Sequence, residues 1–151
     1  MIPMSNPPLV LDTNVFDYKD MVHWLGSYRG DKIIPSVVYM ELAVWYYAKE
    51  GNLRKLDAML RSAAIETRDF DVQHAQSCAY FIKEHRIPKD RWKDAMIAAY
   101  AANPPFILLT NDIRDFSTML GKRAMSPYDF KKAIEEGNLY EFLDPDEPDS
   151  Q

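Results

Sequence analysis

The chain has 151 residues, 47% of them hydrophobic and 27% charged, and its formal net charge at pH 7 is -5. This length forms one ordinary domain with a real core, and no stretch approaches the roughly 18 consecutive apolar residues that a membrane-spanning helix needs. The acidic balance argues against a surface that binds nucleic acid over its whole extent, but it allows clustered acids with a local basic rim.

The first structural signal is an apolar run at residues 9–11 that ends in Asp12, Thr13 and Asn14. Three apolar residues suit a buried parallel strand, and Asp12 then lies at its carboxyl end, where open α/β sheets bind ligands. Asp12 can instead be only the cap of the following helix. The residues before the strand do not resemble a secretory signal, and the single cysteine, Cys78, excludes a disulfide framework, so we expect a cytoplasmic protein.

The rest of the chain alternates between helical and strand-like segments. Helices are predicted over residues 15–28, 36–50, 53–64, 71–86, 90–103 and 126–137, and strands over residues 32–35, 65–70, 106–109 and 123–125. This alternation predicts a three-layer α/β/α domain over residues 1–143, with a mainly parallel sheet of four or five strands. The acidic tail, residues 144–151, contains two prolines and is predicted to be disordered.

Glu41 lies on the second predicted helix, in the middle of an apolar stripe. The apolar side chains that recur around it at helical spacing are Val37, Val38, Val44, Trp45 and Ala48. A carboxylate that points into the core is costly unless it is paired, protonated or bound to a cation. Glu41 is therefore a candidate site residue, and the structural alternative is a buried ion pair with an arginine.

Asp94 begins the apolar face of the predicted helix 90–103 and is followed at helical spacing by Ile97, Ala98 and Ala101. Its place near the start of the helix offers a structural explanation, because an acid there interacts favourably with the helix dipole by about 0.3–1 kcal/mol. That gain is small beside the cost of burying a carboxylate, so Asp94 is a second candidate.

The clearest buried strand, residues 106–109, repeats the opening feature, because it ends in Thr110, Asn111 and Asp112. A turn or cap explains one such strand end readily, but two are harder to explain in that way. The helical segment that follows carries a further acid, Asp115.

Four acids are thereby predicted to share one pocket at the edge of the sheet: Asp12, Glu41, Asp94 and Asp112. Several carboxylates cannot stay ionised together without a counter-charge. Oxygen-rich sites without cysteine or paired histidines suit Mg²⁺ or Mn²⁺ rather than Zn²⁺. Because such a site polarises a phosphoryl oxygen and activates water, the residues predict hydrolysis of phosphodiester bonds.

The densest positive stretch lies at residues 83–93. Its candidates for contacts with RNA phosphates are Arg86, Lys89, Arg91 and Lys93, and the adjacent Trp92 could stack on a base. A solvated helix end explains the same composition, because most runs of charge are simply solvated.

Four short motifs are spread over nearly the whole chain. They are Leu-Asp-Thr-Asn at 11–14, Pro-Ser-Val-Val-Tyr-Met-Glu-Leu at 35–42, Asp-Ala-Met-Ile-Ala-Ala at 94–99 and Leu-Thr-Asn-Asp-Ile-Arg-Asp-Phe at 109–116. In this order they resemble the motifs of PIN-domain ribonucleases, and most of all those of the VapC-type toxins of toxin–antitoxin pairs.

The resemblance implies a PIN-like domain and a metal-dependent endoribonuclease directed at single-stranded RNA, with the four acids as its catalytic and Mg²⁺- or Mn²⁺-binding residues. Asn14 and Thr110 correspond to polar residues that support the site, and Asp115 is an alternative fourth acid. The resemblance also implies a homodimer and a small antitoxin, a segment of which enters the acidic groove.

Three other functions fit parts of the sequence. The chain is long for the toxins, so a PIN nuclease of RNA processing is one alternative, and a non-catalytic PIN-like binding module is another. The third is a haloacid-dehalogenase-like phosphatase, whose nucleophile loop also follows an apolar strand. That loop has a second aspartate two residues after the first, and Asn14 occupies this position here, which disfavours the phosphatase.

Overall fold

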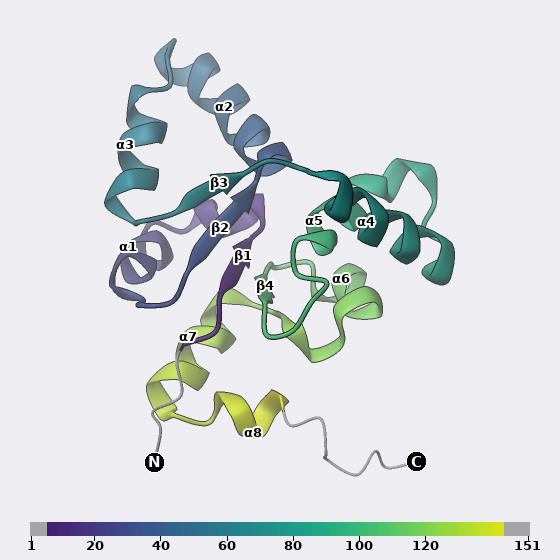
Figure 1. Ribbon diagram of the computed structural model, residues 1–151. Helices are drawn as coiled ribbons and strands as arrows, with labels where there is room; N and C mark the ends of the chain where they lie inside the picture. The colour runs from purple at the N-terminus through teal and green to yellow at the C-terminus, as the bar shows by residue number, and fades with distance from the viewer. Residues whose placement is uncertain (1–5, 144–151) are drawn as a thin grey trace.

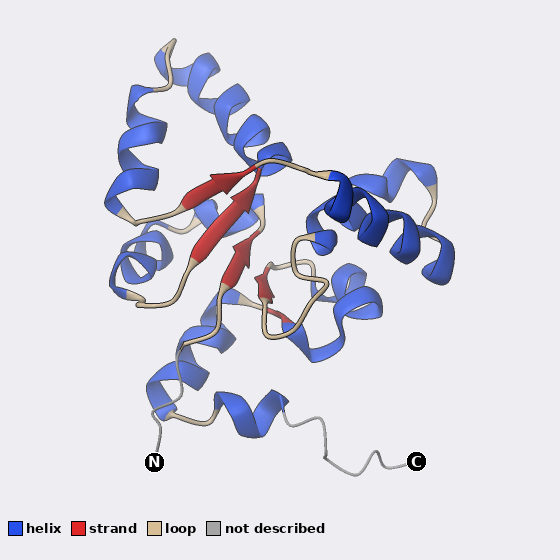
Figure 2. Ribbon diagram, in the orientation of Figure 1, coloured by secondary structure: helices blue, strands red, loops and turns tan. Residues whose placement is uncertain are grey.

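Five short strands form a single parallel sheet at the centre of the molecule (Figure 2). The computed structural model describes residues 6–143 and orders the strands β3-β2-β1-β4-β5, with every neighbouring pair parallel. The strands are β1 (Leu9–Leu11), β2 (Lys32–Pro35), β3 (Glu66–Arg68), β4 (Ile107–Leu109) and β5 (Ala124–Met125). Helices flank the sheet, which confirms the predicted three-layer α/β architecture.

The strands are connected by helices (Figure 1). The α-helices are α1 (Lys19–Ser27), α2 (Ser36–Glu50), α3 (Arg54–Ser62), α4 (Val72–His85), α5 (Trp92–Ala99), α6 (Ile113–Leu120), α7 (Pro127–Glu136) and α8 (Leu139–Leu143), and the 3-10 helices are η1 (Thr13–Asp17), η2 (Lys89–Arg91) and η3 (Gly121–Arg123). None of the helices within residues 6–143 has the length and apolar character needed to cross a bilayer. The predicted tail, 144–151, lies outside the described residues.

The two central strands, β1 and β4, bring the ends of the two apolar runs together. Every residue of both strands is fully buried, as expected for the middle of a parallel sheet. Their register pairs Leu11 with Leu109, and the Asp12 amide donates to the Leu109 carbonyl at 3.0 Å. The chain adds β2 and β3 on one side of β1 and β4 on the other, so Asp12 follows β1 at the switch point where such sheets bind ligands.

The segment predicted as one helix over residues 15–28 is divided in two. The Asp12 side chain accepts a hydrogen bond from the Thr13 amide at 2.8 Å, so helical structure already begins at Thr13, as η1. Tyr18 then adopts an extended conformation, and α1 begins at Lys19. Asp12 is therefore a helix cap, as the structural alternative predicted, but this role uses only one of its two carboxylate oxygens.

The face that α2 buries differs from the predicted stripe. Val44 and Trp45 are 64% and 53% exposed, and the buried residues of the helix are Val38, Leu42 and Ala43. Apolar side chains surround most of this helix, so the spacing alone allowed two different buried faces. The prediction that Glu41 points into the core is therefore wrong.

Arg123 ties the end of α5 to the start of β4. Its guanidinium donates to the carbonyls of Ala101 (2.6 Å), Phe106 (2.9 Å) and Ala102 (3.2 Å). The helix predicted over residues 90–103 is correspondingly shorter, since α5 ends at Ala99 and the carbonyls beyond it bind this cation. The contact fixes α5, which carries Asp94, relative to the strand that leads to Asp112.

Replacing Arg123 by methionine should lower the free energy of unfolding by about 2–4 kcal/mol, because three carbonyls lose a charged hydrogen-bond donor. Urea unfolding followed by circular dichroism measures the change. Arg114→Met is the matched control, because Arg114 is exposed on α6 and its loss should cost less than about 0.5 kcal/mol. Equal stabilities of the two variants would contradict this role of Arg123.

Candidate active site

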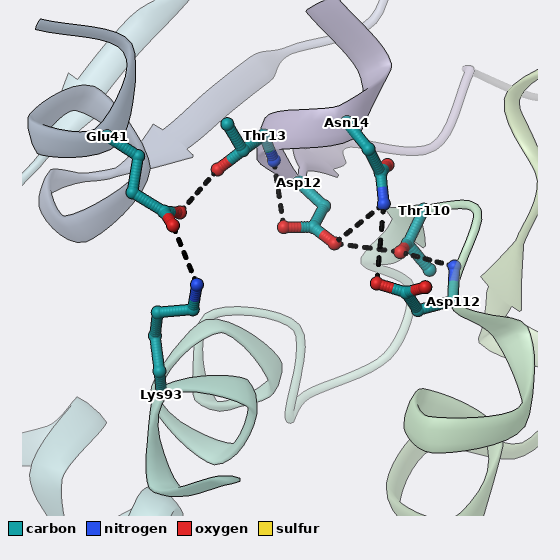
Figure 3. A network of polar contacts seen from close by, with 7 residues as sticks. All are labelled: Asp12, Thr13, Asn14, Glu41, Lys93, Thr110 and Asp112. Carbon is teal, nitrogen blue, oxygen red and sulfur yellow. Dashed lines mark hydrogen bonds and ion pairs between the residues drawn. The ribbon is translucent and has the colours of Figure 1, made fainter. Parts of the chain in front are cut away.

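Asp12 and Thr110 form the centre of the site, at the carboxyl ends of the two central strands (Figure 3). Asp12 is 7% exposed and Thr110 is fully buried. While Asp12 Oδ1 accepts from the Thr13 amide, its Oδ2 accepts from the Thr110 hydroxyl at 2.8 Å. The same hydroxyl oxygen accepts from the Asp112 amide at 3.0 Å, so Thr110 fixes the backbone that carries the next acid.

Asn14 lies between two carboxylates. Its Nδ2 is 3.5 Å from Asp12 Oδ2 and 3.4 Å from Asp112 Oδ2, and its Oδ1 accepts from the Asn111 amide at 3.2 Å. Figure 3 shows Asp12 and Asp112 on either side of this amide. Within residues 6–143, neither carboxylate forms an ion pair with a lysine, arginine or histidine. A neutral side chain thus links the two acids at the strand ends.

Glu41 reaches the site from α2 through a threonine. Its Oε1 accepts from the Thr13 hydroxyl at 2.6 Å, and its Oε2 is 2.6 Å from Lys93 Nζ (Figure 3). The Glu41 side chain is 29% exposed, so this is a half-buried ion pair of the kind that the structural alternative predicted, but with a lysine instead of an arginine. Sequence reasoning missed Thr13 as a link, because a hydroxyl after a strand was interpreted only as a turn or cap residue.

Asp94 and Asp115 form the third part of the site with Arg91. Arg91 Nη2 is 3.0 Å from Asp115 Oδ1, and Arg91 Nε is 3.6 Å from Asp94 Oδ2. Asp94 lies in the first turn of α5, as predicted, and its side chain is 23% exposed. The structure thus brings all five candidate acids to one edge of the sheet, divided among three groups of contacts.

Burial raises the pKa of Asp12 above its ordinary value. Hydrogen bonds from Thr110 and Thr13 favour the charged carboxylate and oppose this effect, whereas the negative charges of Asp112 and Asp94 add to it. The pKa of Asp94 is likewise raised, first by burial and then by Asp115, against the lowering effect of Arg91. The anionic form of the site is therefore costly, and a bound cation would relieve that cost.

The donor set fits the predicted metal in its chemistry. Carboxylate, hydroxyl and amide oxygens are the ligands that Mg²⁺ and Mn²⁺ prefer. In the part of the chain that the structure describes, no three histidine, cysteine, aspartate or glutamate side chains converge closely enough to hold an ion as they stand. Binding would require the carboxylates to leave some of their present partners.

The four predicted RNA-contact residues fall into two groups. Arg91 and Lys93 turn toward the acids, as described above. Arg86 and Lys89 remain exposed, and the Lys89 ammonium lies 5.6 Å from the ring centroid of Trp92, which is itself 41% exposed. Arg86 and Lys89 thus form the part of this basic surface that is exposed and lies apart from the acids.

A cleft of about 680 Å³ adjoins the site and includes Thr13 and Glu41 in its wall. Its other lining comes mainly from aromatic and apolar side chains of η1, α1, α2 and α3, among them Phe16, Trp45 and Met59. Trp45 and Tyr46 of α2 therefore belong to a concave surface that includes Glu41.

Asp94→Asn should raise the free energy of unfolding of the metal-free protein at pH 7 by about 0.5 kcal/mol. The pKa of Asp94 in the folded protein lies above its ordinary value of 3.8. Between these two pKa values the folded protein binds more protons than the unfolded chain, so stability falls as the pH rises through this range. The penalty is fully present at pH 7, so the gain of the variant should disappear below about pH 4.

Thermal unfolding at a series of pH values measures this gain. Asp31→Asn is the control, because Asp31 is an exposed acid just before β2, at the opposite edge of the sheet, and its replacement should not produce the same pH-dependent gain. An Asp94→Asn variant that is no more stable than the wild type at pH 7 would contradict the electrostatic cost.

Comparison with known proteins supports the same fold. The model of the PIN domain family matches residues 9–119, whereas no curated protein sequence matches the chain significantly. A toxin-antitoxin complex from Klebsiella pneumoniae is 21% identical with a TM-score of 0.62, over 80% of this chain and 98% of that chain. VapBC2 from Rickettsia felis, bound to a DNA fragment from their promoter, is 24% identical with a TM-score of 0.58, over 75% of this chain and 93% of that chain. The family match covers most of the chain, which therefore belongs to the PIN domain family.

Proposed function

We propose that the protein is a metal-dependent endoribonuclease of the cytoplasm and the toxin of a type II toxin–antitoxin pair. The observation that carries the proposal is the pair Asp12 and Asp112, held by Asn14 at the ends of two parallel strands without a cationic partner among the described residues. The PIN family match supports nuclease chemistry. Asn14, which contacts both carboxylates, occupies the position where the phosphatase alternative needs a second aspartate.

The residues that would hold Mg²⁺ or Mn²⁺ are the acids of the site: Asp12, Glu41, Asp94 and Asp112, with Asp115 as an alternative fourth acid. A divalent cation bound there supplies a Lewis acid for a phosphoryl oxygen and lowers the pKa of water. The chain itself orients the acids, since Thr110 and the Thr13 amide fix both oxygens of Asp12. The exposed Arg86 and Lys89 are the proposed contacts with RNA phosphates.

Asp12→Asn should reduce metal-dependent RNA cleavage at least about 100-fold, because it removes the most buried carboxylate of the site. The measurement is cleavage of single-stranded RNA by purified protein with Mg²⁺ or Mn²⁺. Asp31→Asn makes the same chemical change at the opposite edge of the sheet and should cleave as the wild type does. Wild-type activity in Asp12→Asn would refute the proposal.

The melting temperature tests the alternative of a non-catalytic binding module. A cation that binds only the folded protein at ten times its dissociation constant stabilises it by about 1.4 kcal/mol. The nuclease should therefore melt at a higher temperature in Mg²⁺, and Asp12→Asn should lose this shift. If the protein is a binding module whose acids are only structural, Mg²⁺ should shift the melting temperature of neither the wild type nor Asp12→Asn.

The cleft beside Glu41 is the proposed seat of an antitoxin segment. Most of its wall is apolar or aromatic and the wall includes Glu41, which suits a peptide that anchors an apolar side chain beside this acid. Of the two neighbours in fold, one was solved as a toxin-antitoxin complex and the other as VapBC2 bound to promoter DNA. The protein is also proposed to be a homodimer, as the resemblance implies.

A small protein encoded next to this chain should bind it and inhibit cleavage, and Trp45→Ala should weaken that binding at least about tenfold. Isothermal titration calorimetry measures the affinity. Tyr80→Ala is the control, because Tyr80 is an exposed aromatic residue of α4 and does not line the cleft. If no neighbouring frame encodes such a protein, the RNA-processing alternative is favoured over the toxin.

A further inference from the structure

Lys93 places a positive charge inside the acidic site. It is the residue next to Asp94 on α5, and its ammonium is 2.6 Å from Glu41 Oε2, across 52 residues of sequence. The negative charges of Asp12 and Asp94 also favour its charged form, although burial opposes it. Its contact with Glu41 therefore brings a positive charge into the group of proposed metal-binding acids.

Both oxygens of Glu41 are occupied in this arrangement. Oε1 accepts from the Thr13 hydroxyl and Oε2 binds the Lys93 ammonium, each at 2.6 Å. Figure 3 shows Lys93 reaching toward Glu41 from the helix opposite. A divalent cation that binds Glu41 therefore has to displace either the hydroxyl or the ammonium from one of the Glu41 oxygens.

The ammonium is the partner that a cation would displace. Two cations close to one carboxylate oxygen repel each other, and at a separation of about 4 Å this repulsion is substantial in a half-buried site. The Thr13 hydroxyl is neutral and raises no such barrier. The Lys93 side chain is long and 49% exposed, so it can move away into solvent without disturbing the core.

We propose that Lys93 is a tethered counter-cation, which neutralises Glu41 in the metal-free protein and leaves it when a divalent cation enters the acidic site. The proposal rests on the proposed metal-dependent function and makes Lys93 a positioning residue that sets the metal affinity of the site. Arg91 is a weaker competitor, because its shorter contact is with Asp115 and its contact with Asp94 is 3.6 Å.

Calorimetric titration of the full chain with Mn²⁺ tests this role without measuring activity. Lys93→Met should bind Mn²⁺ about tenfold more tightly than the wild type, because it keeps most of the length of the side chain and removes the competing charge. Lys93→Arg keeps the charge and should stay within about threefold of the wild type. Lys132→Met, an exposed residue on α7, makes the same change in net charge and should stay within about twofold.

A double-mutant cycle locates the effect. In a Glu41→Gln background, Lys93→Met should change the Mn²⁺ affinity less than about twofold, because the carboxylate for which the two cations compete is absent. Circular dichroism and melting temperatures establish that each variant is folded.

The outcomes separate this inference from the proposed function. If the wild type binds Mn²⁺ through Asp12, but Lys93→Met binds no more tightly than Lys132→Met, the counter-cation role is refuted and the metal site stands. If Lys93→Met raises the Mn²⁺ affinity as much in the Glu41→Gln background as in the wild type, the competition at Glu41 is refuted. If no folded variant binds Mn²⁺, Lys93→Met included, both the metal-dependent function and this inference fail.

Discussion

The register between β1 and β4 is the constraint on which the rest of the site depends. Leu11 pairs with Leu109, so the two chains leave the sheet side by side and the Thr110 hydroxyl meets Asp12. Both strands are completely buried. A shift by one residue would draw Asp12 into the apolar interior or separate it from Thr110, and an unpaired buried carboxylate is too costly to persist. Packing of apolar side chains thus fixes the geometry of the acids.

The sequence was sufficient to predict the sheet and the two acids at its strand ends. Short apolar runs that end in Asp12 and Asp112 carry this information directly, because parallel strands place their carboxyl ends at one edge. The environment of Glu41 was not predictable in the same way. The helix that carries it has apolar residues on most of its surface, and only the packing of the folded chain selects Val38, Leu42 and Ala43 as the buried face.

The pairing of Lys93 and Arg91 with the acids was not predictable for a different reason. Lys93 and Arg91 belong to a basic run that has the composition of a solvated helix end, and the acids that they contact most closely, Glu41 and Asp115, lie on other helices. Pairs between distant segments leave no periodic trace in a sequence. The same holds for Thr13 and Asn111, whose hydrogen bonds join the loops after β1 and β4 to their surroundings.

The acids of the site fall into two groups that differ in the charge of their partners. Glu41, Asp94 and Asp115 have cationic partners, so a large part of the repulsion among the acids is relieved within the chain. Among the described residues, Asp12 and Asp112 form no ion pair and share the neutral amide of Asn14, so the strand ends keep negative charge without a directly bound cation. An arginine at position 14 would neutralise these acids and compete with any incoming cation. An amide holds the two carboxylates in place and leaves their attraction for a divalent cation intact, because it contributes hydrogen bonds without a net charge.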